Sequence, residues 1–139
     1  MKLTFISLFL SFTLSLTLQA DTSAEALYDA KCASCHIKTR PVAKSDLVAP
    51  PIMGVMLHVK MRYKTKEEAV KFINDYVMNP QKDKSVCKKG KLKRFGLMPS
   101  QKGVLTDEEL NTISEWVYDN FPPAGFKGMN QRSNKSCGN

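Results

Sequence analysis

Apolar residues recur at helical spacing in three separate stretches of the chain. The two longer stretches are 65–78, with its stripe on Ala69, Phe72, Ile73 and Tyr76, and 106–120, with Leu110, Ile113, Trp116 and Val117. Residues three or four positions apart share one face of an α-helix, so each stretch is predicted to be an amphipathic helix. A shorter apolar face over 23–32, following Thr22 or Ser23 as a cap, predicts a third helix.

Both longer stretches carry the same start signal. Thr65 is followed three residues later by Glu68, and Thr106 is followed three residues later by Glu109. This spacing is that of a capping box, in which the hydroxyl and the carboxylate each bind a backbone N–H of the first turn. Pro80 ends the first of these helices, because the residue before a proline avoids helical geometry.

The connections between these helices are long. Residues 37–54 contain three prolines and are predicted to be a loop, as is the stretch 80–105. The chain shows no internal repeat and no convincing strand pattern. We therefore expect an all-α domain of three main helices, whose apolar faces cannot easily cover one another across such loops. A flat apolar group at the centre of the domain would cover these apolar faces.

The N-terminus has the pattern of an export signal. Lys2 precedes an uncharged run rich in Leu, Phe and Ile, and Ala20 is a small residue suited to a cleavage point. We predict a signal peptide over 1–20, with an uncleaved anchor as the alternative. The chain has 139 residues, which leaves one folded domain over 21–123. A Gly-, Lys-, Ser- and Asn-rich tail, 124–139, follows it and is expected to be flexible.

Cys32-Ala33-Ser34-Cys35-His36 is the attachment signature of a c-type haem. Two thiols at this spacing add across the two vinyl groups of the porphyrin, and the histidine that follows is held beside the iron. The motif therefore predicts one covalently bound haem c, with Cys32 and Cys35 as attachment points and His36 as an iron ligand. A thioredoxin-like dithiol would need a βαβ context, and a structural zinc site would need four ligands.

The second iron ligand should come from a loop that wraps round the haem edge. Met98 lies in such a loop, beside Pro99 and shortly before the last helix. A thioether is a weak, soft ligand that favours ferrous iron. Met56, Met61 and His58 are the remaining candidates, although methionine is also a common core residue.

In order and spacing, several short segments resemble the class I cytochrome c family over roughly 22–121. The segments are Leu27-Tyr28, the Cys32–His36 motif, Ala49-Pro50-Pro51-Ile52-Met53-Gly54, Leu97-Met98-Pro99 and Leu105-Thr106-Asp107-Glu108-Glu109. The resemblance implies a small class I cytochrome c-like fold around one haem. It also implies Met98 as the distal ligand and a hydrogen bond from the His36 ring to the Pro50 carbonyl. Tyr28 would pack across Trp116 or Ile113.

Charge narrows the choice of partner. The formal net charge is +8, which favours acidic partners. An export signal argues against nucleic acid, and no motif points to a small-molecule substrate. A basic run between the middle and last helices is predicted to dock an acidic redox protein, with a solvated loop as the plainer interpretation. Its residues are Lys82, Lys84, Lys88, Lys89, Lys91, Lys93 and Arg94.

Cys87 and Cys137 are not used by the motif. In an oxidising compartment we expect them to form a disulfide, with separate thiols or intermolecular pairing as the alternatives. His58, the second histidine of the chain, is expected to be a structural residue.

These features predict a periplasmic one-electron carrier with at most peripheral membrane contact, rather than an enzyme. The alternatives are a haem subunit of a larger periplasmic oxidoreductase, and a haem enzyme or sensor with an exchangeable distal ligand. Donor, acceptor and oligomeric state are not encoded in any motif.

Overall fold

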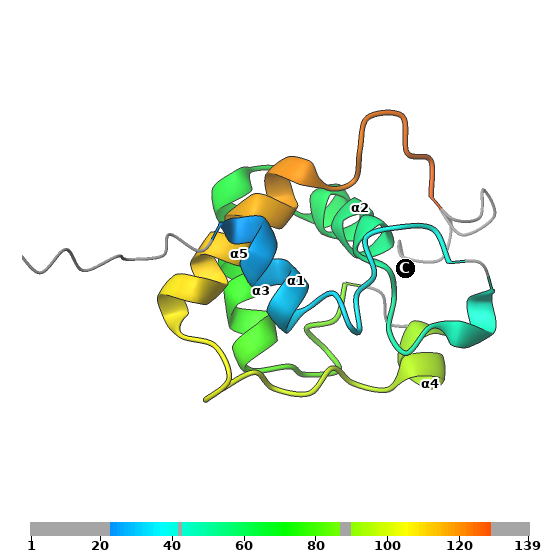
Figure 1. Cartoon of the computed structure of the whole chain (residues 1–139), viewed down its shortest axis with the longest axis horizontal. Coiled ribbons are helices and arrows are strands. Elements are labelled where there is room, and N and C mark those ends of the chain that lie inside the picture. Colours follow the sequence, from blue (N-terminus) through cyan, green and yellow to red (C-terminus); the bar gives the residue numbers. More distant parts are fainter. Residues whose placement is uncertain (1–22, 42, 87–89, 129–139) are drawn as a thin grey trace, which may run out of the picture.

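The computed structural model describes residues 23–41, 43–86 and 90–128 of the chain. Figure 1 shows the arrangement of its helices. These are α1 (Ala24–Lys31), the 3₁₀ helix η1 (Lys44–Asp46), α2 (Ile52–Arg62), α3 (Lys66–Met78), α4 (Lys91–Phe95) and α5 (Asp107–Asn120). Within the described ranges the only β-type pairing is an isolated bridge between Lys102 and Leu105. The predicted all-α class is confirmed.

The three helices expected from the apolar pattern are present as α1, α3 and α5. The Ser23 hydroxyl caps α1 by accepting a 3.2 Å hydrogen bond from the Ala26 N–H. At α3 and α5 both halves of the capping box form. The threonine hydroxyl accepts from the backbone of the glutamate, and the glutamate side chain accepts from the backbone of the threonine. Local capping chemistry therefore sets where both long helices begin.

Two further helices accompany the three main ones: α2 begins inside the predicted loop 37–54 and runs beyond it, and α4 lies within the predicted loop 80–105. α2 begins at Ile52, directly after Pro51, whose carbonyl accepts from the N–H groups of Gly54 and Val55. A proline is well suited to a helix start, because the backbone N–H that it lacks would have no helical partner there in any case. α4 is five residues long and lies between Gly90 and Gly96, both with positive φ, where glycine is strain-free.

The core forms where α5 packs against α3 and α1, and over a smaller area against α2. In Figure 1, α1 and α5, from opposite ends of the chain, lie side by side. Tyr28 of α1 is 1% exposed, and its ring centroid lies 5.3 Å from that of Trp116 and 6.3 Å from that of Phe121. The buried core cluster consists of Tyr28, Ile52, Met56, Val59, Ala69, Leu105, Leu110, Ile113 and Val117.

Several sequence-based predictions concern residues outside the described ranges. These are the signal peptide over 1–20, Cys87, Cys137 and most of the predicted tail. The start of the tail is described, and there the Phe126 N–H donates a 3.1 Å hydrogen bond to the Pro123 carbonyl. In the part of the chain that the structure describes, no helix is long and apolar enough to cross a membrane.

Candidate functional site

The Cys32–His36 motif forms a compact turn at the end of α1. The N–H of Cys32 donates to the Tyr28 carbonyl at 2.8 Å, which continues the helical pattern by one residue. The carbonyl of Cys32 then accepts from the N–H groups of Cys35 at 3.2 Å and His36 at 2.8 Å. Cys32 is half-buried and Cys35 is exposed. Two thiols and one imidazole thus come from a single turn of backbone.

The His36 ring is oriented by the loop that leads into α2. Its Nδ1 lies 2.7 Å from the carbonyl oxygen of Pro50, the contact that the family resemblance implies. A carbonyl oxygen can only accept, so this hydrogen bond places the ring proton on Nδ1 and leaves the Nε2 lone pair available to a metal. A backbone hydrogen bond of 3.1 Å, from the Ile52 N–H to the Ile37 carbonyl, joins the same two segments.

Burial sets the protonation states at this turn. It lowers the pKa of His36, an effect that the hydrogen bond to the Pro50 carbonyl partly opposes. The imidazole is therefore neutral at neutral pH, which is the form that binds metals. Burial, with a smaller contribution from Cys35, raises the pKa of the Cys32 thiol to about 11. Cys32 is accordingly an S–H group rather than a thiolate at neutral pH.

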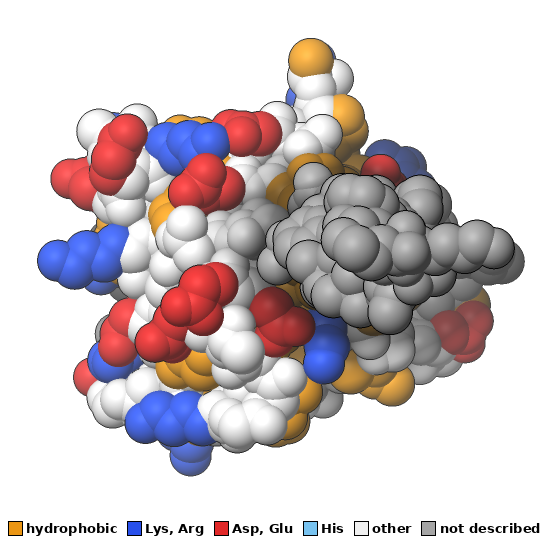
Figure 2. Space-filling view, turned by 60° about the vertical axis from the view of Figure 1, so that its left-hand side comes forward, with side chains coloured by type: hydrophobic (Ala, Val, Ile, Leu, Met, Phe, Trp, Pro, Cys, Tyr) orange, Lys and Arg blue, Asp and Glu red, His pale blue; other side chains and the backbone are white. Residues whose placement is uncertain are grey.

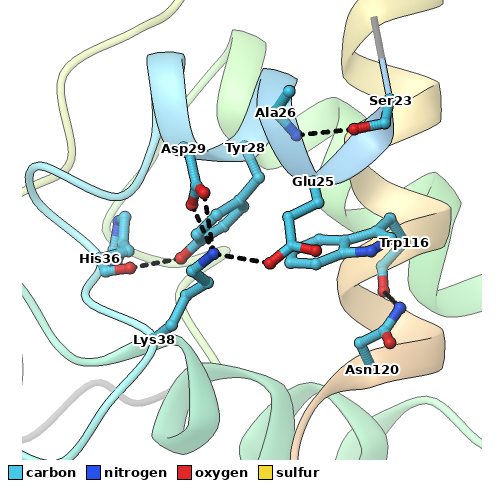
Figure 3. A network of polar contacts seen from close by, with 9 residues as sticks. All are labelled: Ser23, Glu25, Ala26, Tyr28, Asp29, His36, Lys38, Trp116 and Asn120. Carbon is cyan, nitrogen blue, oxygen red and sulfur yellow. Dashed lines mark hydrogen bonds and ion pairs between the residues drawn. The ribbon is translucent and has the colours of Figure 1, made fainter.

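A network of polar contacts fastens this turn to α1 (Figure 3). The Tyr28 hydroxyl donates to the carbonyl oxygen of His36. Two residues further along, the Lys38 ammonium lies 2.8 Å from a carboxylate oxygen of Glu25 and 2.7 Å from one of Asp29. The same ammonium lies 5.9 Å from the centre of the Trp116 ring, within the range of a cation–π contact.

Met98 comes from a separate segment, between α4 and α5. Just beyond it, the Ser100 hydroxyl donates to the Met78 carbonyl at 2.5 Å, and the Gln101 N–H donates to the Val77 carbonyl at 3.1 Å. Both acceptors are at the C-terminal end of α3. Met98 is half-buried and lies two residues before Ser100, where the hydrogen bonds to α3 begin.

Comparison with known proteins identifies the family. Residues 19–117 match the family described as "Cytochrome C oxidase, cbb3-type, subunit III". The chain belongs to the c-type cytochromes. A relative from Aquifex aeolicus (strain VF5), described as "Uncharacterized protein", is 31% identical over 122 residues, which are 78% of this chain and 80% of the relative. No solved structure matched the chain significantly.

The residues present in this cytochrome fit a covalently bound haem c. Cys32 and Cys35 are on one turn, and the neutral His36 that follows them keeps its Nε2 lone pair for a metal. Among the described residues, no group of three or more His, Cys, Asp or Glu side chains comes together to hold a metal ion.

The basic run of the cytochrome is only partly a free positive surface. Lys84 forms a 2.7 Å ion pair with Asp75 of α3, and the Arg94 guanidinium donates to the Lys44 carbonyl of η1. Lys93 is exposed on α4. Burial, together with the neighbouring charges of Arg94 and Lys44, lowers the pKa of Lys91. Lys88 and Lys89 are outside the described residues.

Two residues of the site were not predicted in their present roles. Tyr28 was expected only to pack on the last helix, yet its hydroxyl also binds the His36 backbone. A tyrosine at a position where phenylalanine would pack equally well is the one sequence signal for this contact. Lys38 gave no signal, because its contacts depend on how the chain turns after the motif.

Proposed function

We propose that the protein is an exported monohaem cytochrome that carries one electron between redox partners. Cys32 and Cys35 would hold the haem, and His36 and Met98 would occupy the two axial positions of the iron. The observation that carries this proposal is the 2.7 Å contact between His36 Nδ1 and the Pro50 oxygen, which keeps the ring proton on Nδ1 and leaves the Nε2 lone pair available to a metal. When bound, haem supplies a one-electron iron couple whose potential is set by its axial ligands.

Packing supports Met98 over the other methionines. Met56 is 1% exposed within the core cluster, so its side chain already has a structural role. Met61 is 45% exposed on the last turn of α2. Met98 is half-buried, on a segment anchored to α3 by Ser100 and Gln101. With His36 and Met98 both as ligands, no coordination position would be left for a substrate, and neither ligand would have to move when the iron changes charge.

Visible spectroscopy of the oxidised haem-loaded protein tests this ligand pair. The wild type should show a sulfur-to-iron charge-transfer band, which Met98→Ala should abolish and Met61→Ala should leave unchanged. High-spin iron that binds carbon monoxide readily in the wild type would argue instead for an exchangeable distal site, and so for an enzyme or sensor. Loss of the band in Met61→Ala alone would move the ligand to α2.

The net charge and the N-terminal pattern support the proposed partners and the proposed location in the periplasm. The leader over 1–20 would direct the protein to the periplasm, where the haem is attached and any membrane contact is peripheral. The net charge of +8 favours redox proteins with acidic docking faces. Figure 2 shows one face of the molecule, on which acidic and basic side chains are interspersed. Among the described residues Lys66 pairs with Asp119 at 2.7 Å, and Lys38 pairs with Glu25 and Asp29.

A second candidate is a haem subunit of a larger oxidoreductase. It is favoured by the family description, which names a subunit of a cbb3-type oxidase. Size-exclusion chromatography of a mild detergent extract of the native envelope separates the two. A soluble carrier elutes at the size of a single chain. A subunit elutes with membrane proteins that bear further redox centres.

A further inference from the structure

The backbone that carries His36 is fixed to α1 by two side chains that are not themselves candidate ligands. The Tyr28 hydroxyl binds the carbonyl of His36. The Lys38 ammonium, two residues along the chain, binds the carboxylates of Glu25 and Asp29. Figure 3 shows both attachments reaching the same helix, α1.

Packing does not explain the Tyr28 hydroxyl. The ring is 1% exposed and makes its aromatic contacts with Trp116 and Phe121 through carbon atoms. Phenylalanine would keep those contacts, whereas a buried hydroxyl is unfavourable unless it is hydrogen-bonded. Its partner is the carbonyl of His36, so the hydroxyl contributes a restraint on that backbone.

The ring of His36 is held by a different segment of the chain from the one that holds its backbone. Its Nδ1 is 2.7 Å from the Pro50 oxygen, and Pro50 belongs to the segment that leads into α2. One hydrogen bond therefore fixes the backbone of His36 relative to α1, and a second fixes its ring relative to α2. With both ends of the side chain fixed, Nε2 can point in only one direction.

We propose that Tyr28 and Lys38 are positioning residues for the His36 imidazole, which they keep in one orientation by fixing the backbone at residues 36 and 38. The proposal rests on the proposed function, because orientation matters only if Nε2 binds the haem iron. The hydrogen bond made by the second ring nitrogen of a metal-bound histidine sets both its orientation and its basicity. Loosening the backbone at His36 should therefore weaken the bond from Nδ1 to Pro50.

The test measures that bond directly by proton NMR, in the haem-loaded, full-length protein in its diamagnetic ferrous state. In Tyr28→Phe, the Nδ1 proton of His36 should exchange with solvent about fivefold faster than in the wild type, the factor that corresponds to one ordinary hydrogen bond. The midpoint potential should rise, because a less basic imidazole stabilises ferric iron less. Ser114→Ala is the matched control, since it removes another buried hydroxyl, one that binds Asn74 and not the motif.

Lys38→Met provides a second variant should Tyr28→Phe fail to fold, and Lys66→Met is its control. Lys66 also pairs with carboxylates, those of Asp119 and Glu115, but joins α3 to α5. Lys38→Met should speed the exchange of the Nδ1 proton, whereas Lys66→Met should not. If each variant matches its control, the positioning role is overturned while His36 ligation stands. If the wild-type spectrum shows no imidazole on the iron, the proposed function fails, and this inference fails with it.

Discussion

The hydroxyl of Ser114 on α5 donates a 2.6 Å hydrogen bond to the side-chain oxygen of Asn74 on α3. Ser114 is fully buried, and apart from the Tyr28 hydroxyl it carries the one buried polar side chain among the residues the structure describes. Asn74 in turn donates to Asn111 at 3.1 Å, so the contact continues along α5. This polar contact fixes how α3 lies against α5 within an otherwise apolar interface.

Replacing Ser114 by alanine should lower the free energy of unfolding by about 1–3 kcal/mol, because the Asn74 oxygen loses its partner at a buried position. Denaturant unfolding followed by circular dichroism measures this change. Thr112→Ala is the control, since the Thr112 hydroxyl binds the Glu108 carbonyl on the exposed side of α5. It should cost less than about 0.5 kcal/mol. Equal losses in the two variants would remove any special role for Ser114.

The capping box at α5 makes a second prediction. Thr106→Ala should lower the free energy of unfolding by about 1 kcal/mol, because the Glu109 N–H loses the hydroxyl that lies 3.1 Å away. Thr106→Ser keeps an oxygen at this position and should behave nearly as the wild type. The same unfolding measurement applies. A serine variant as unstable as the alanine variant would show that the methyl group, not the cap, is what matters.

His58 should make stability depend on pH. Burial, and secondly the charge of Lys91, lowers the pKa of His58 in the folded protein. The unfolded chain then binds the extra proton near the ordinary histidine pKa of about 6.5. Unfolding therefore becomes easier as the pH falls below that value, and the effect is absent well above it.

In the haem-loaded protein, where His36 is proposed to be bound to iron, the fall in unfolding free energy between about pH 7 and pH 5 should be smaller in His58→Gln than in the wild type. Urea unfolding at a series of pH values measures the slope. Parallel curves for the two proteins would mean that the pKa of His58 is the same in the folded and unfolded states.

The basic run should steer anionic oxidants to the protein. The rate of oxidation by ferricyanide, followed by stopped flow, should fall as ionic strength rises, because salt screens exposed charges. Lys93→Gln, on exposed α4, should slow the reaction at low salt by more than Lys66→Gln does. The Lys66 ammonium is paired with Asp119, a contact that joins α3 to α5. At about 1 M salt, where the screening length is about 3 Å, the two variants should converge. Rates that do not change with salt would count against steering.

Local signals in the sequence predicted the fold well where one short segment contained all the information. Thr65 with Glu68 and Thr106 with Glu109 each marked a helix start, because both partners of the capping box are three residues apart. The predicted loop over 37–54 includes the first residues of α2, because Pro50, Pro51 and Gly54 are residue types that favour loops. The buried residues Ile52, Met56 and Val59 of α2 do follow helical spacing.

The candidate site was predictable in its chemistry and only partly in its geometry. The motif itself names Cys32, Cys35 and His36, and a family resemblance was needed to bring Pro50, 14 residues away, to the His36 ring. The contacts of Lys38 with Glu25 and Asp29 depend on the path of the chain after the motif. No periodicity in the sequence encodes that path.

The pairing of Tyr28 with Trp116 has a consequence for the order in which the protein matures. A chain that emerges from its N-terminus delivers α1 and the motif first, but the aromatic partners of Tyr28 belong to the last helix and the residue that follows it. Until Trp116 and Phe121 arrive, α1 has no surface to dock on, and Cys32 and Cys35 stay accessible. Chain order thus provides an interval in which Cys32, half-buried in the folded protein, can be modified before α1 docks.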